Sequence, residues 1–388
     1  MKSKLSSLCI YIKDKVAVDT LDEKTYISTE NMIPNKGGVE CASSLPSTQC
    51  TQSFDMGDIL VSNIRPYFKK IWMAEYSGGC SNDVLVFRAS KGCDPTFLYY
   101  VLADDSFFDY ATATSKGTKM PRGDKSAIMQ YEVSPFDKAT QQRIGSLLRS
   151  IDKRIVTNKK INDNLQQQLR TIFKAEFTDN PELEKMTQIP LSELCHVVTK
   201  GTTPTTLGKP FVESGINFIK AESILADHSL DKSKFAFIDE ETNALLKRSV
   251  IHAGDVVFTI AGTLGRFALI DDNVLPANTN QAVAIIRADA EKVLPEYIYT
   301  CFIGEWHTDY YAKRVQQAVQ ANLSLTTIKS LPIPVLDKAK MDEYLRLILP
   351  LIKAIKGNEA QNEKLAALRD ALLPKLMSGE IDVSDIQL

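Results

Sequence analysis

The clearest pattern of apolar and polar positions in the chain occurs twice, about 200 residues apart. Apolar residues and paired asparagines recur there in steps of three and four. The first seam comprises Leu148, Ile151, Ile155, Asn158, Asn162, Leu165 and Leu169, and the second comprises Ile348, Leu351, Ile355, Asn358, Asn362 and Leu365, before slipping to Leu368 and Leu372. Such steps predict a coiled-coil seam rather than the broader stripe of a helix lying on a globular core.

The two seams predict long helices at 137–178 and 337–378. Asp137 and Asp337 stand where N-caps belong. About 40 residues at 1.5 Å each would give a length of roughly 60 Å. Pro350 is expected to kink the second helix or to delay its regular part.

Asparagine in an apolar seam costs stability but specifies register and partner. Because both seams carry asparagines in the same register, we expect the two helices to pair with each other, antiparallel. Replacing Asn158 and Asn358 with leucine is then expected to raise thermal stability and loosen the register. The alternative is that each seam is an ordinary core stripe.

Each long helix follows a segment of mixed character. Short β-branched and aromatic runs bounded by Gly, Asn and Asp predict strands, among them "GDILVSNI", "DVLVFRAS", "GDVVFTIAG" and "QAVAIIRA". "PTFLYYVLADDSFFDYA" and "PEYIYTCFIGEWHTDYYAKRVQQA" predict helices that open with proline in the first turn.

The mixed segments resemble one another. "LSSLC" at Leu5–Cys9 matches "LSELC" at Leu191–Cys195, "GDILVS" matches "GDVVFT", and "DPTFLYYVL" matches "LPEYIYTCF", always in the same order. A preserved order of matches indicates a duplication. The predicted fold class is α+β, with two tandem-repeated mixed α/β domains separated by two long helices that pair as an antiparallel coiled coil. The predicted boundaries are 1–136, domain one; 137–178, central helix; 179–186, linker; 187–336, domain two; 337–378, distal helix; and 379–388, tail.

Composition is that of an ordinary globular protein, with 44% hydrophobic and 24% charged residues. The apolar run near the start is cut off by Lys13 and Asp14, too early for a signal peptide, and no stretch approaches 18 uncharged apolar residues. Seven cysteines without a CxxC pair are typical of reduced thiols. We expect the chain to be cytoplasmic.

Catalytic and metal-binding motifs are absent from the sequence. It has no GxxxxGK[ST] loop and no GxGxxG after a strand, and its four histidines lie outside HExxH and zinc spacings. The chain is therefore expected to bind no metal or cofactor and not to be an enzyme. An enzyme with an unrecognised site remains an alternative.

What remains is a set of loops rich in hydrogen-bond donors. Arg, Gln, Asn and Thr read base edges in the major groove, while Lys anchors phosphates. Because the net charge is −2, the chain as a whole has no basic surplus, and DNA binding would depend on a local basic surface. The candidate DNA-binding residues are Arg65, Tyr67, Lys69, Lys70, Lys116, Lys119, Arg122, Lys125, Lys200, Thr202, Thr203, Lys220, Thr263, Arg266, Lys313, Arg314, Gln317 and Asn322. The alternative for each loop alone is solvated surface.

The chain resembles the specificity subunit of type I restriction-modification enzymes over essentially its whole length. The resemblance is carried by "LSELCHVVTKGTTPTT", "GDVVFTIAGTLGRFALI", "NLSLTTIKSLPIPVLDKAK" and "LRDALLPKLMSGEI". The first copy matches less well, because "RPYFKK" stands in place of "GTLGR".

This resemblance implies two target-recognition domains that each read half of a split DNA site, and helices that hold them apart. It implies that the partners are double-stranded DNA, two methyltransferase subunits that dock on the helices, and the restriction subunits, with no membrane. S-adenosylmethionine, ATP and Mg would be bound by those partner subunits. The rival interpretation is a pseudo-symmetric coiled-coil scaffold that binds proteins.

Overall fold

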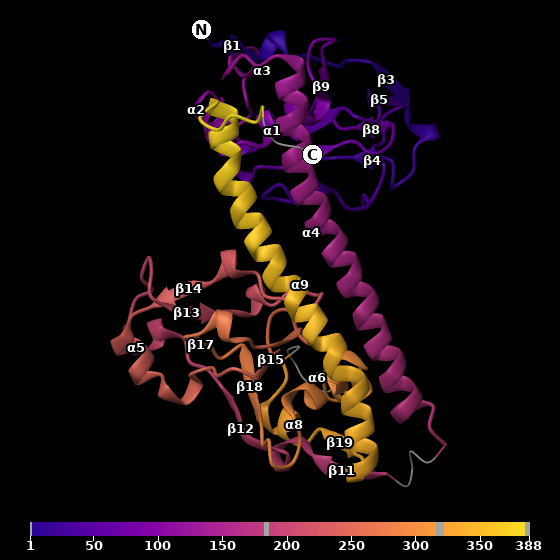
Figure 1. Cartoon of the computed structure of the whole chain (residues 1–388), viewed down its shortest axis with the longest axis vertical. Helices are drawn as coiled ribbons and strands as arrows, with labels where there is room; N and C mark the ends of the chain where they lie inside the picture. The colour runs from indigo at the N-terminus through magenta and orange to yellow at the C-terminus, as the bar shows by residue number, and fades with distance from the viewer. Residues whose placement is uncertain (1, 182–185, 316–321, 385–388) are drawn as a thin grey trace. The chain divides into compact units, whose positions relative to one another are not determined.

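The computed structural model describes residues 2–181, 186–315 and 322–384 (Figure 1). Contacts divide the chain into two compact units. The first unit comprises Met1–Val156 and Asn362–Leu388, and the second comprises Thr157–Gln361. The predicted domain boundaries separate the helices from the mixed segments instead, and they stay a prediction.

The first unit is built on two four-stranded sheets. One is antiparallel, with the order β2 (Cys9–Tyr11), β9 (Val84–Ala89), β6 (Ile59–Ser62), β7 (Ile71–Met73). The other has the order β3 (Lys15–Ala17), β5 (Cys50–Phe54), β8 (Gly78–Cys80), β4 (Tyr26–Ile27). A short pair, β1 (Ser3–Lys4) and β10 (Glu132–Val133), completes the strands of this unit.

Strand β6 shows how the antiparallel sheet is buried on both faces. Ile59 and Val61 belong to a core formed with the helices, whereas Leu60 belongs to a second core. Successive side chains of a strand point to opposite faces, so a fully apolar run is required where both faces are covered.

Three short helices follow in the first unit: α1 (Pro95–Ala103), α2 (Asp105–Ala113) and α3 (Lys125–Ile128). The sequence predicted one helix where α1 and α2 lie, and this was wrong. Asp104 has extended backbone, and its carboxylate accepts a hydrogen bond from the Ser106 N–H at 2.8 Å. An aspartate that caps a new helix end ends the previous helix.

The second unit repeats this plan. Its antiparallel sheet has the order β12 (Cys195–Lys200), β18 (Val283–Ala288), β15 (Val256–Thr259), β16 (Phe267–Leu269). A three-stranded sheet has the order β14 (Ala236–Ile238), β13 (Ile216–Ile219), β17 (Ala277–Thr279), and β11 (Thr187–Pro190) pairs with β19 (Pro332–Val335). The short helices are α5 (Glu240–Leu245), α6 (Pro295–Ile303), α7 (Thr308–Val315) and α8 (Leu325–Lys329).

Here too one predicted helix is two. Helix α6 ends before Gly304, whose ideal Cβ would lie 2.1 Å from a Phe173 ring carbon. Only glycine fits at that approach, and Glu305 next to it has a positive φ of 60°. The break lets the chain turn before α7 begins.

An ion pair between a partly exposed arginine and a buried aspartate recurs in both units and confirms the duplication in three dimensions. In the first unit, Arg88 donates to both carboxylate oxygens of Asp58, at 2.7 and 2.6 Å. In the second, Arg287 donates to both oxygens of Asp255, at 2.7 Å each. In each unit the aspartate lies in the Gly-Asp turn just before one strand, β6 or β15, and the arginine lies in the neighbouring strand, β9 or β18.

The long helices are α4 (Lys138–Phe173), which continues as a π-helical turn over Lys174–Thr178, and α9 (Lys338–Ser378). Both predicted N-caps are confirmed: Asp137 accepts from the Thr140 N–H at 2.7 Å, and Asp337 accepts from the Lys340 N–H at 3.0 Å. Because α9 runs through Pro350 from Lys338, its regular part is not delayed.

Within the second unit, the two helices pair antiparallel through their asparagines. Asn158 donates to the Gln361 Oε1 at 2.7 Å, and Asn358 donates to the Asn162 Oδ1 at 2.8 Å. Asn162 in turn donates to the Ile355 carbonyl at 3.2 Å. The partner number falls as the α4 number rises, so the predicted antiparallel pairing is confirmed.

Within the first unit, the pairing is partly polar. Asp152 of α4 accepts from the Arg369 Nη1 at 2.9 Å and from the Tyr100 hydroxyl at 2.5 Å. Leu368 is 48% exposed, and Leu373 and Leu376 are buried instead. The prediction that the seam continues through Leu368 was therefore wrong. Of the described helices, none is long and apolar enough to cross a membrane.

Candidate nucleic-acid interface

The candidate loops of the first unit meet at the end of the antiparallel sheet where β6 ends and β9 begins. The Arg65 N–H donates to the Pro121 carbonyl at 2.8 Å, and the Gly123 N–H donates to the Asn63 carbonyl at 3.1 Å. Lys116 and Arg122 face each other as an isolated antiparallel bridge. Segments 63–70 and 116–125, distant in sequence, thus form one surface.

The first of these segments presents an aromatic turn. Arg65 and Lys69 flank it with positive φ values of 49° and 52°, which are uncommon for residues with a side chain. Tyr67 and Phe68 are exposed, with ring centroids 4.8 Å apart, and the Arg65 guanidinium lies 6.0 Å from the Phe68 centroid. Backbone strain held around exposed aromatic rings is a feature of binding sites.

Two lysines of this turn are tied to the protein. The Lys69 ammonium lies 3.0 Å from the Asp105 carboxylate, and the Lys70 ammonium donates to the Thr29 carbonyl at 2.6 Å. Burial lowers the pKa of Lys70 from its ordinary value. Both ammonium groups are thus less available to a phosphate than a solvated lysine.

The second segment is a hairpin with mixed ion pairing. Lys116 pairs with Asp124 at 2.5 Å, and the Arg122 guanidinium bonds Asp83. Lys119 at the hairpin tip and Lys125 at the start of α3 are exposed, and no ion pair involves them within the described residues. These two lysines are the better phosphate anchors of the set.

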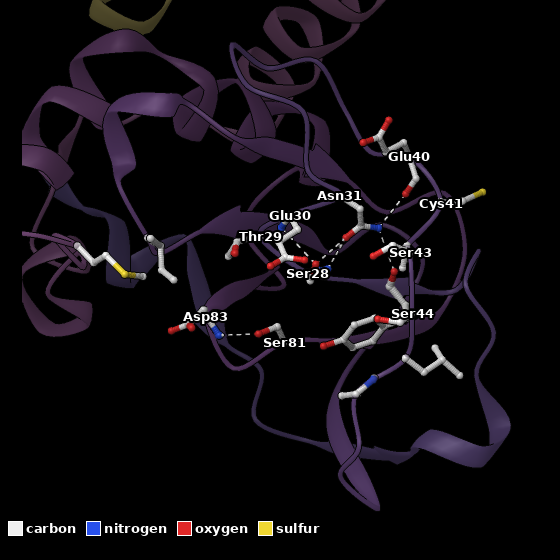
Figure 2. A pocket seen from close by; sticks show the side chains of 16 residues that line it. Ser28, Thr29, Glu30, Asn31, Glu40, Cys41, Ser43, Ser44, Ser81 and Asp83 are labelled. Atoms are coloured by element: carbon white, nitrogen blue, oxygen red, sulfur yellow. Dashed lines mark hydrogen bonds between the residues drawn. The ribbon is translucent and has the colours of Figure 1, made fainter. Parts of the chain in front are cut away.

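A cavity of about 470 Å³ opens beside this hairpin, lined by Tyr26, residues 28–31 and 40–46, Ile64, Ser81, Asp83 and Met120 (Figure 2). Most of the labelled side chains end in a hydroxyl or a carboxylate, including Glu30 and Glu40. The Asp83 N–H donates to the Ser81 hydroxyl at 3.3 Å. The cavity therefore offers mainly hydrogen-bond acceptors.

In the second unit, the candidate residues lie at the equivalent end of the sheet. Lys200 ends β12, and the Gly201 N–H donates to the Asn280 carbonyl at 3.1 Å. Thr203 donates to the Gln281 side chain, and Thr202 accepts from Arg248 at 3.4 Å. The loop after β12 is thus held against the residues just before β18.

Thr263 and Arg266 lie in the turn between β15 and β16. The Thr263 hydroxyl donates to the Ala221 carbonyl at 3.3 Å, and the Arg266 Nη1 donates to the Ile224 carbonyl at 3.1 Å. Lys220, from the neighbouring segment, pairs with Glu222 at 2.9 Å. The Arg266 side chain is therefore committed to its own domain through at least one nitrogen.

The remaining candidates are described only in part. Asn322 is exposed, next to Leu323, whose N–H donates to the Ile260 carbonyl at 2.9 Å. The side chains of Lys313 and Arg314, and the whole of Gln317, lie outside the described residues.

Sequence reasoning missed Asp83 as a partner of this surface. No motif surrounds it, and its role depends on a contact across 39 positions of the chain. The available signal was that Asp83 immediately precedes a predicted strand. In an antiparallel sheet, the residue before one strand lies at the same end of the sheet as the residue after the neighbouring strand.

Comparison with known proteins shows which families and structures the chain resembles. The family model described as Type I restriction modification DNA specificity domain matches residues 184–365. The chain is 22% identical over 305 residues to the type I restriction enzyme MjaIX specificity subunit of Methanocaldococcus jannaschii, covering 75% of this chain and 70% of that protein. It is 22% identical over 446 aligned positions to the HindI specificity subunit of Haemophilus influenzae, covering 92% and 94%.

A solved structure agrees at the level of the fold. The type I restriction-modification S subunit from M. genitalium matches with a TM-score of 0.57 at 17% identity, covering 97% of this chain and 96% of that one. The matched domain, relatives along nearly the full length and a shared fold converge on one conclusion. Residues 184–365 match the type I restriction modification DNA specificity domain, and the chain as a whole is similar in sequence and in fold to specificity subunits of type I restriction enzymes.

Proposed function

We propose that each mixed segment reads one half of a bipartite DNA site. The observation that carries this proposal is the repetition of one sheet order in both units, with candidate loops at the same sheet end but with different residues. A shared frame with different side chains suits two readers of two different sequences, because base edges are distinguished by the pattern of donors and acceptors that meets them.

The helices then serve as a spacer and as a docking surface for the methyltransferase subunits. Two readers on one duplex need a defined separation, about 34–36 Å for each helical turn between half-site centres. The 36 residues of α4 and the 41 residues of α9 correspond to about 54 and 62 Å at 1.5 Å per residue. Helices of that length are long enough for this purpose.

Catalysis belongs, in this proposal, to the partner subunits. Two methyltransferase subunits and the restriction subunits would bind S-adenosylmethionine, ATP and Mg, and this chain would bind no cofactor. Partner subunits could also supply phosphate contacts, which dominate affinity for DNA. With its net charge of −2, the chain alone is expected to bind DNA weakly, in the cytoplasm where that DNA lies.

The test is single-molecule mapping of methylated bases in a host that carries this chain with its methyltransferase subunit. Exchange of residues 1–136 for the matching segment of another specificity subunit is expected to change one half of a split motif and leave the other intact. A change in both halves would contradict the assignment of one reader to each segment. The absence of any new modified motif, with a confirmed complex, would favour the protein-binding scaffold.

A further inference from the structure

One pair of side chains in the first unit has the geometry to select a particular base. We propose that Arg122, oriented by Asp83, reads a guanine in the half-site of the first unit. In this proposal Arg122 determines specificity and Asp83 is a positioning residue. The inference rests on the proposed function, because it assigns a base to the same DNA surface.

The backbone of Arg122 is held on both sides. Its N–H donates to the Lys116 carbonyl at 2.9 Å, and its carbonyl accepts from the Lys116 N–H at 2.8 Å. The residues before and after it, Pro121 and Gly123, bond the segment at 63–65. A side chain on a backbone held in this way can adopt few orientations, and a specific base contact requires such a restricted orientation.

Asp83 occupies one edge of the guanidinium. Its carboxylate oxygens accept from Nε at 3.1 Å and from Nη2 at 3.3 Å. Asp83 is itself placed by its carbonyl, which accepts from the Asn63 N–H at 2.8 Å, and by its N–H, which donates to Ser81. Both members of the pair therefore have anchored backbones.

The other edge of the guanidinium is free for a ligand. Within the described residues no hydrogen bond or ion pair involves the Arg122 Nη1, and the side chain is 52% exposed. Nη1 and the outer N–H of Nη2 form two parallel donors. Guanine presents two adjacent acceptors, O6 and N7, in the major groove, whereas adenine places an amino group beside N7 and cytosine presents a donor. Two parallel donors therefore select guanine.

The carboxylate also argues against a phosphate at this position. A phosphate carries negative charge, and Asp83 would repel it at close range, whereas the guanine edge is neutral. The exposed Lys119 and Lys125 are compact charges without a carboxylate partner in the described part of the chain. Lysines of this kind suit phosphates, and the supported arginine suits a base.

The second unit lacks this pair at the equivalent positions. The Ile260 N–H donates to the Ala282 carbonyl at 2.8 Å, as the Asn63 N–H does to Asp83 at 2.8 Å. By the same correspondence, Asn322 stands where Arg122 stands. Alanine cannot orient an arginine, so guanine reading through this pair is confined to the first half-site.

The experiment uses the full chain in complex with its methyltransferase subunit, and compares methylation rates on duplexes that differ by one base pair. R122A and R122K are expected to lose discrimination at a single G·C position of the first half-site, by roughly 5- to 150-fold. D83N is expected to lose part of that discrimination at the same position with an unchanged melting temperature, and D83E to recover some of it. N322A is the matched control and should leave this position unaffected.

Three outcomes separate the possibilities. Uniform weakening by R122A at every position would make Arg122 a phosphate contact and overturn the guanine assignment, while DNA recognition stands. A first half-site composed only of A·T pairs would overturn it as well. A wild-type complex that modifies no specific sequence would remove the proposed function itself, and this inference with it.

Discussion

Two buried histidines of the second unit carry no charge at neutral pH. His228 stacks on the Phe267 ring at 3.9 Å, and His307 lies among Phe258, Phe302 and Tyr311. Burial lowers the pKa of each to about 4, helped by Arg170 for His228 and by His228 for His307. An imidazolium at His307 would lose its hydration without gaining a partner of opposite charge, and at His228 the attraction of Asp227 is smaller than the cost of burial.

The second unit is therefore expected to lose stability in mild acid. The unfolded chain takes up protons on these histidines near pH 6.5, while the folded unit takes them up only near pH 4. The stabilisation is thus present above pH 6.5 and is lost as the pH falls from 6.5 to 4, by up to about 3 kcal/mol for one group. H307F should flatten this slope in urea unfolding curves measured from pH 7 to pH 4.

The matched control is H252N, because His252 is exposed. Its curve should follow the wild type at every pH. An H307F protein with the full wild-type slope would show that His307 is not a source of the acid sensitivity.

At the residue scale, the sequence predicted which segments carry donors but not what holds them. Arg122 and Arg266 look alike in sequence, since both lie in Gly-containing loops. Their difference arises from partners distant in the chain: Asp83 supports the first, and the Ile224 carbonyl binds the second. Such partners depend on how the sheets pack, which local sequence does not encode.

At the element scale, the asparagines of the paired helices are linked across the seam. Because Asn358 donates to Asn162, a single N358L substitution would remove the donor that satisfies the Asn162 Oδ1. Leaving such a group unsatisfied costs about 1–3 kcal/mol. We therefore expect N358L alone to lower thermal stability, contrary to the expectation drawn from the seam pattern.

The double variant N162L/N358L tests that reasoning, since it removes both members of the pair. It is expected to regain the lost stability or exceed that of the wild type, because an apolar pair leaves no unsatisfied group. A double-mutant cycle by thermal denaturation measures the coupling. If the loss of stability in the double variant equals the sum of the losses in the two single variants, a direct bond between Asn162 and Asn358 is contradicted.

Periodicity predicted the long helices well because their pattern is sustained over many turns. The caps at Asp137 and Asp337 confirm where they begin. Short helices were predicted less well. The break at Asp104 depends on its carboxylate accepting a hydrogen bond from the first turn of the next helix. The break at Gly304 depends on the Phe173 ring, which is distant in sequence.

At the scale of the whole molecule, the first unit includes the last part of the chain. Leu373, Leu376 and Val383 belong to the same core as Leu148 and the helices α1 and α2. The sequence predicted a duplication, but not that one compact unit would be completed from both ends of the chain. The repeat pattern alone cannot show which copy of the mixed segment a helix contacts.

L376A is accordingly expected to destabilise the first unit, by about 2–5 kcal/mol, because it removes a fully buried side chain. Hydrogen exchange read out by peptide should show faster exchange over residues 84–113. L368A is the matched control, since Leu368 is 48% exposed. If L376A leaves exchange in that region unchanged, the C-terminal half of α9 contributes nothing to the first core.

The discontinuity of the first unit has a consequence for biosynthesis. Residues 157–361 form one uninterrupted stretch, whereas the first unit lacks part of its core until residues 373–383 have been made. A ribosome adds about 5–20 residues per second, and domains fold as units once their residues are available. The unit encoded first is therefore the last to be finished, and a stop codon just before residue 373 would damage the core of the unit that contains residues 1–156.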